Sequence, residues 1–126
     1  MFACPYFDWS ERKRARRNKK FYPVDTGLRR IAVTKTGRDL GTMLECATYV
    51  RLRQHFRDVY YWRGRGEVVF VVLEDGDPVP IQVSWDGAKE RHHRALDEFH
   101  EIHPRAAEGV FVTAETFEEG VARLGI

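Results

Sequence analysis

The pattern of apolar positions changes from a helical to a strand-like period near residue 58. Between residues 40 and 57, apolar side chains recur every three or four positions, which predicts an amphipathic helix. Residues 58–63 are aromatic and β-branched, and residues 67–74 form a near-continuous apolar run, so each predicts a strand. A turn rich in acids, at residues 74–78, separates this second strand from a third at residues 79–85.

The C-terminal part of the chain returns to a helical period and then alternates again. Residues 88–102 carry one apolar stripe, and Pro104 ends the predicted helix. Residues 109–113 predict a short buried strand, and Thr116 with Glu119 predicts a capping box that opens a last helix. A strand–helix–strand crossover implies one parallel pair, so we expect an α/β fold with a mixed central sheet flanked by helices.

The N-terminal part has a different character from this strand–helix core. Residues 10–18 predict a short helix, and a turn is predicted at Asp25–Gly27. We therefore expect a basic N-terminal arm with a short helix at residues 1–22 and an α/β domain at residues 23–126, forming a single domain overall. The basic residues of the arm, 12–20, are expected to lie outside the strand–helix core.

Length and composition add little beyond a single globular domain. The chain has 126 residues, of which 43% are hydrophobic and 32% charged. It has no apolar run of membrane-spanning length and no signal-peptide pattern. The two cysteines, Cys4 and Cys46, lie far apart, so we expect a reduced, cytoplasmic protein without contact to membranes.

The net charge of +2 hides a strong asymmetry. One run holds 7 of the 21 Lys and Arg residues, while the other 14 are outnumbered by 19 acids. A basic run of this kind suits contact with the phosphates of nucleic acid, an acidic partner or anionic lipid, and it is equally typical of a solvated arm. The candidate nucleic-acid-binding residues are Arg12, Lys13, Arg14, Arg16, Arg17, Lys19 and Lys20.

Four short motifs, in order, resemble one known family. They are Lys20–Leu28 (KFYPVDTGL), Leu40–Glu45 (LGTMLE), Tyr61–Arg63 (YWR) and Glu67–Phe70 (EVVF). Together with the helix–three strands–helix–strand order, they resemble the C-terminal domain of unknown function of bacterial and archaeal AAA-type P-loop ATPases. That family belongs to the PD-(D/E)XK nuclease-like superfamily, so the resemblance implies a restriction-endonuclease-like αβββαβ core with an extra C-terminal helix.

The resemblance also implies where a nuclease site would lie. In the superfamily a helix Glu, a strand Asp and a Glu-x-Lys pair hold Mg²⁺ and position water. Carried over to this chain, the helix Glu is Glu45 and the strand Asp is replaced by Val69. The Glu-x-Lys positions hold Gln82 and Ser84. Only one of the four charges remains, so the resemblance implies a degenerate site.

Two other kinds of metal site remain open. Glu67 shares a strand face with Val69, and Lys89 follows on the next helix, so a relocated Mg²⁺-dependent nuclease site is an alternative. In the simpler interpretation Glu67 faces solvent, and Glu45 is hydrogen-bonded to backbone or to Tyr61. A zinc site is a weaker alternative, drawn from His92, His93, His100 and His103.

We therefore expect a non-catalytic nuclease-like module without a cofactor. It would be the detached or truncated C-terminal domain of an ATPase-family protein, and it would recognise nucleic acid or a protein such as the ATPase module. A third alternative is a protein-interaction or oligomerisation domain, with aromatic side chains as interface anchors. The candidate anchors are Phe2, Tyr6, Phe7 and Trp9 in one cluster and Tyr60, Tyr61 and Trp62 in another. The simpler interpretation of the second cluster is an ordinary buried strand.

Overall fold

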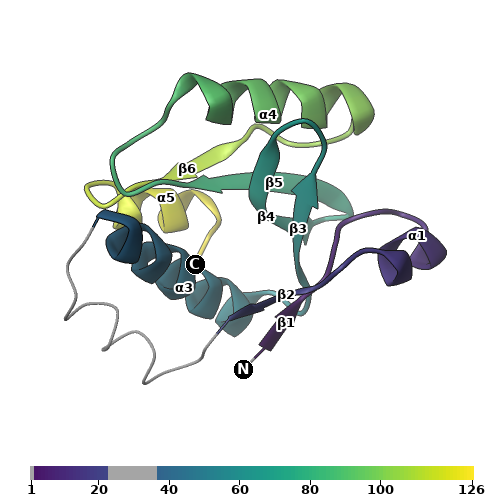
Figure 1. The fold of residues 1–126 in the computed structure, drawn as a ribbon, viewed down its shortest axis with the longest axis horizontal. Helices are drawn as coiled ribbons and strands as arrows, with labels where there is room; N and C mark the ends of the chain where they lie inside the picture. The colour runs from purple at the N-terminus through teal and green to yellow at the C-terminus, as the bar shows by residue number, and fades with distance from the viewer. Residues whose placement is uncertain (1, 23–36) are drawn as a thin grey trace.

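A four-stranded mixed sheet forms the centre of the molecule (Figure 1). The computed structural model describes residues 2–22 and 37–126. The strands lie in the order β3 (Val59–Arg63), β4 (Glu67–Glu74), β5 (Asp77–Val83) and β6 (Val110–Val112). The first three are antiparallel, and β6 pairs with β5 in parallel, as the predicted crossover requires.

Helices cover both faces of this sheet (Figure 1). Helix α4 (Glu90–Ile102) packs on β4 and β5, whereas α3 (Gly37–His55) packs on β3 and β5 from the other face. Helix α5 (Phe117–Arg123) lies against β6. The α/β class and the element order are thus confirmed for this part of the chain. None of the described helices combines the length and apolar character needed to cross a bilayer.

The N-terminal segment contributes two short strands and four side chains to the folded core. Strands β1 (Phe2–Cys4) and β2 (Lys20–Tyr22) form an antiparallel pair that sequence patterns did not predict. Between them lies α1 (Glu11–Arg16), which has no buried residue and begins after Ser10, whose side chain accepts the Lys13 N–H. The residues of this segment that are buried in the hydrophobic core are Cys4, Tyr6, Phe7 and Tyr22. Helix α1 therefore lies on the surface, whereas its two flanks are built into the core.

Residues 5–7 also close the outer edge of β3. The Phe7 N–H donates to the Tyr61 carbonyl at 2.7 Å, and the Tyr61 N–H donates to the Pro5 carbonyl at 3.0 Å. Tyr6 and Tyr61 form a parallel bridge, with their rings edge to face at 5.5 Å. These bonds satisfy backbone groups that an edge strand otherwise leaves unpaired.

A two-residue turn joins β4 and β5. Asp75 and Gly76 have φ values of 53° and 86°, and the Asp-Gly pair suits a turn that needs positive φ at both positions. The predicted turn is therefore confirmed, but Asp77 does more than form it, because its carboxylate lies 2.9 Å from the Arg105 guanidinium. The proline at position 80 is tolerated inside the sheet because β6 pairs with β5 only from Ile81 onward.

Two smaller predictions, the capping box at Thr116 and the turn at Asp25–Gly27, are not confirmed. Thr116 precedes α5 at the N-cap, but its side chain makes no cap hydrogen bond and instead pairs with the Thr113 hydroxyl at 2.7 Å. The predicted capping box with Glu119 is therefore wrong. The predicted turn at Asp25–Gly27 lies outside the described residues.

Candidate functional site

Strand β4 carries a bulge near Val69, the position that the motif resemblance aligns with a strand Asp. Tyr60 pairs with Val71 and Trp62 pairs with Val68, so two steps on β3 match three on β4. The extra residue lies opposite Tyr61, in the stretch that contains Val69. Bulges of this kind interrupt the ladder and leave backbone groups without strand partners.

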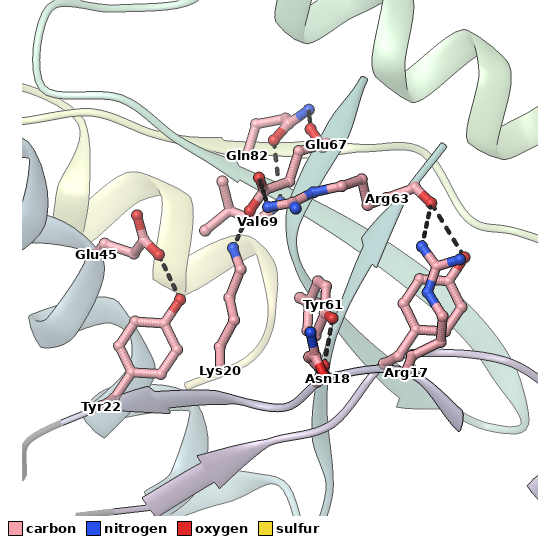
Figure 2. Close-up of polar contacts among 11 residues, drawn as sticks. Arg17, Asn18, Lys20, Tyr22, Glu45, Tyr61, Arg63, Glu67, Val69 and Gln82 are labelled. Carbon is pink, nitrogen blue, oxygen red and sulfur yellow. Dashed lines mark hydrogen bonds and ion pairs between the residues drawn. The ribbon is translucent and has the colours of Figure 1, made fainter. Parts of the chain in front are cut away.

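On the other side of β4, Gln82 takes over the pairing with β5 beyond Phe70 and Ile81. The β4–β5 ladder ends at Phe70 and Ile81, and the Gln82 side chain continues it (Figure 2). Its amide oxygen accepts the Val69 N–H at 3.2 Å, and its amide nitrogen donates to the Glu67 carbonyl at 2.8 Å. The same nitrogen lies 3.3 Å from the His92 carbonyl of α4. Gln82 is fully buried, so its amide is committed to the backbone and is not available as a metal ligand.

Glu67 is neutralised by two cations rather than facing solvent. Its carboxylate forms an ion pair with the Lys20 ammonium, and the Arg63 guanidinium lies 2.9 Å away (Figure 2). The Lys20 and Glu67 side chains are 25% and 32% exposed, so the pair is partly shielded from water. Burial lowers the pKa of Lys20, and the charge of Glu45 opposes that shift. Lys20 therefore stands between the two carboxylates that the nuclease alternative assigns to a metal.

Glu45 accepts a hydrogen bond from the Tyr22 hydroxyl (Figure 2). Burial raises the pKa of Tyr22, and the Glu45 charge raises it further, so the phenol keeps its proton and donates. The predicted partner, Tyr61, instead donates to the Asn18 carbonyl.

A separate hollow of about 290 Å³ brings together other predicted residues. Glu45 and Ser84 line it together with Asp86 and Lys89, whose side chains approach to 3.9 Å. Lys89 thus shares a hollow with Glu45 but not with Glu67, the other carboxylate of the relocated-site alternative. Glu67, Val69 and Gln82 do not line this hollow, so the five predicted positions are divided between the hollow and the bulge.

The cations of the basic run fall into two groups, and those at every third position from residue 14 to residue 20 pack on tyrosine rings. Arg14, Arg17 and Lys20 lie over the rings of Tyr60, Tyr6 and Tyr61, at 5.8, 4.2 and 5.0 Å respectively. The other four cations of the run are exposed, and their side chains make no ion pair or hydrogen bond with the part of the chain that the structure describes. These four define the exposed basic surface: Arg12, Lys13, Arg16 and Lys19.

Three of the four predicted zinc histidines have structural roles instead, and His93 is exposed with its ring against Phe111. The His92 Nδ1 accepts the Lys89 N–H at 2.9 Å at the start of α4, and both ring nitrogens of His100 lie 2.7 Å from backbone carbonyls. His103 is buried against the Phe7 ring. Within residues 2–22 and 37–126, no three His, Cys, Asp or Glu side chains form a group able to hold a metal ion.

The predicted interface aromatics mostly belong to the core. Tyr60, Tyr61 and Trp62 are buried, in agreement with the simpler interpretation of that strand. In the N-terminal cluster Tyr6 and Phe7 are also buried, whereas Trp9 is 56% exposed. Of the side chains in these two clusters that the structure describes, Trp9 is therefore the one exposed enough to anchor an interface.

Sequence reasoning missed the roles of Lys20 and Tyr22 in the site. Both residues lie in the KFY motif, and they are two positions apart on β2, so their side chains leave the same face of the strand. That alternation was the available signal, but it has meaning only once β2 is known to be a strand. Comparison of the chain with family models, curated proteins and solved structures finds no match.

Proposed function

We propose that this chain is a non-catalytic module of the restriction-endonuclease-like fold that binds the phosphate backbone of nucleic acid. The helix, three-strand, helix and strand order and the parallel β5–β6 pair support that fold assignment. The motif resemblance supports a relationship to the C-terminal domains of AAA-type ATPases, with an ATPase module as a further candidate partner.

The single observation that carries the proposal is the division of the basic run. Lys20 of the run, together with Arg63 of β3, neutralises the Glu67 carboxylate within the chain. Arg12, Lys13 and Arg16 project outward from α1, a helix whose side chains contribute nothing to the core. One segment thus both blocks a nuclease-like carboxylate and presents unpaired positive charge to a partner.

The physical chemistry of this surface favours phosphate contacts over base recognition. Lys and Arg side chains bind phosphate oxygens and carry no sequence information by themselves. α1 has six residues, which is too short to act as a groove-reading helix with several base contacts. We therefore expect weak, sequence-independent binding whose affinity falls steeply with salt.

A fluorescence anisotropy titration over a range of salt concentrations tests the proposal. With four phosphates neutralised on duplex DNA, log K should fall with log salt at a slope of about −3 to −4. Replacing the exposed basic surface by alanine (Arg12→Ala, Lys13→Ala, Arg16→Ala, Lys19→Ala) should abolish binding at moderate salt and flatten the slope.

A matched control removes the same charge from other surfaces. It replaces four exposed arginines, Arg57, Arg65, Arg94 and Arg123, by alanine. This variant should bind nearly as tightly as the unmodified protein, because phosphate contacts depend on local charge. An equal loss of affinity in both variants would indicate only a general charge effect. Absence of binding by the unmodified protein at low salt would refute the proposed function.

The hollow beside Glu45 favours one competing function. It holds Glu45 and Asp86 with Lys89, a set of charges suited to a relocated Mg²⁺-dependent nuclease site. That alternative predicts cleavage of labelled DNA or RNA with Mg²⁺ or Mn²⁺, abolished by Glu45→Ala. In the proposed function neither metal supports cleavage, and calorimetric titration of Mn²⁺ detects no binding that Glu45→Ala removes.

A further inference from the structure

A small hollow beside α1 gathers positive charge around one aromatic ring. Its volume is about 200 Å³, and it is lined by Tyr6, Asp8, Lys13, Arg16 and Arg17. The Arg17 guanidinium lies 4.2 Å from the centre of the Tyr6 ring and donates to the Arg63 carbonyl at 3.3 Å. These two contacts hold the guanidinium in place, while its remaining N–H groups are available to a ligand.

The charges of this hollow favour an anion. Lys13, Arg16 and Arg17 contribute three positive charges against the single negative charge of Asp8. One Asp8 oxygen already accepts the Ser10 N–H at 2.9 Å, so the carboxylate has a local structural role at the entry to α1. A phosphate group matches this arrangement in charge and in its capacity to accept from a guanidinium.

Trp9 lies next to this hollow along the chain. It follows Asp8 directly, and 56% of its surface is exposed, an unusual position for so large an apolar side chain. Its ring rests against the buried Phe7 ring, with centroids 5.1 Å apart and planes 72° from parallel. The contact with Phe7 supports the indole on a rigid base while leaving much of it open to solvent.

Building on the proposed function, we infer that this surface selects single-stranded over duplex nucleic acid. A phosphate occupies the hollow of Tyr6, Lys13 and Arg17, and a neighbouring base stacks on Trp9. In a single strand every base has a free π-face for such stacking, whereas in a duplex those faces are covered by adjacent base pairs. The cations then set the salt dependence, and Trp9 sets the preference for single strands.

The test compares two forms of one probe. A labelled thymidine oligomer of about 15 nucleotides is titrated alone and as a duplex with its adenosine complement. The unmodified protein should bind the single strand more tightly. Trp9→Ala should weaken single-strand binding by about fivefold to a hundredfold, the usual effect of losing one base–aromatic stack, and leave duplex binding within about twofold. Trp9→Phe keeps an aromatic face and should recover most of the loss.

Phe21→Ala provides the matched control. Phe21 is the other aromatic side chain exposed near the basic run, at 61%, and it pairs with Ala3 in the β1–β2 sheet rather than lining the hollow. Its removal should leave both affinities within about twofold of the unmodified protein. Circular dichroism of each variant shows whether the fold is retained.

The possible failures are distinguishable. If neither probe binds, the proposed function itself is refuted. If both probes bind but Trp9→Ala weakens them equally, or not at all, nucleic-acid binding stands and the single-strand inference is overturned. An equal loss for Phe21→Ala also overturns the inference, because it replaces a specific stack by a general apolar effect.

Discussion

The ammonium of Lys20 forms an ion pair with the carboxylate of Glu67, although 47 positions separate the two residues in sequence. Lys20 belongs to β2 and Glu67 to β4, so the pair joins the N-terminal sheet to the central one. The same contact therefore joins the two sheets and places a cation beside a carboxylate that the nuclease alternative assigns to a metal.

Replacing Lys20 by Met should destabilise the protein. The substitution keeps the apolar stem but leaves the partly buried Glu67 with Arg63 as its remaining cation. The expected loss is about 1–3 kcal/mol, between the values typical of exposed and fully buried pairs. Urea denaturation followed by circular dichroism measures it. Lys19→Met, at the exposed neighbouring position, should cost less than about 0.5 kcal/mol, and equal losses would contradict the role assigned to the pair.

Replacing Gln82 by the glutamate that the motif resemblance implies for this position should be strongly unfavourable. In Gln82→Glu the buried side chain loses its N–H donor, and a carboxylate then faces the carbonyls of Glu67 and His92. We expect a loss of about 3–5 kcal/mol at neutral pH. Ser84→Lys, at the half-buried position two residues on, should cost less than about 1 kcal/mol. Similar midpoints for both variants in a urea melt would show that the Gln82 hydrogen bonds contribute little.

The central sheet was predictable because its sequence signals are local. The apolar run of residues 67–74 and the Asp75–Gly76 turn specify strand and turn through side-chain pattern and backbone conformation alone. The same holds for the stripe of α4, which buries Ala95, Leu96 and Phe99. These elements differ from their predicted ranges by a few residues at most.

The site was less predictable because it depends on partners far apart in sequence. A basic residue in a run of seven looks solvated, and only tertiary structure separates Lys20, which neutralises Glu67, from Lys19, which faces solvent. Gln82 likewise gives no sign that its amide continues the β4–β5 ladder, because its backbone partners at Val69 and Glu67 lie 13 and 15 positions away in sequence. Three-residue strands such as β2 are too short for a periodic signal.

Both cysteine thiols should be unreactive in the folded protein. Burial raises the pKa of Cys4 to about 12, and its Sγ lies 3.5 Å from the Val59 carbonyl. Burial also raises the pKa of Cys46. At pH 8 a disulfide reagent such as Ellman's reagent should therefore modify neither thiol rapidly, and both should react at once in denaturing urea. Rapid modification under native conditions, traced with Cys4→Ser and Cys46→Ser, would contradict this assignment.

The stability of the fold should decrease as pH falls below about 6.5, in part through His103. Burial lowers the pKa of this imidazole in the folded protein, and the charge of Asp8 opposes the shift. The unfolded chain, with a histidine pKa near 6.5, therefore binds the proton first as the pH falls. The contribution of His103 to the free energy of unfolding is therefore complete above about pH 6.5. Below that pH it declines by at most about 1.4 kcal/mol per pH unit.

His103→Phe removes this titrating group and keeps a ring between Phe7 and Phe99. Urea denaturation at a series of pH values from 7.5 to 5.5 should give a shallower dependence for the variant than for the unmodified protein. The dependence should not vanish, because burial also lowers the pKa of His92. Identical slopes for the two proteins would exclude His103 as a contributor.

The backbone bonds from Pro5 and Phe7 to Tyr61 bear on how the protein resists aggregation. Exposed sheet edges are templates on which strands of other molecules add, and the β3 edge is already occupied by the chain's own residues. The opposite edge, β6, spans three residues and offers little length for intermolecular pairing. Removal of residues 2–7 would uncover the aromatic β3 strand, so the N-terminal segment protects solubility as well as shaping the surface that carries the basic run.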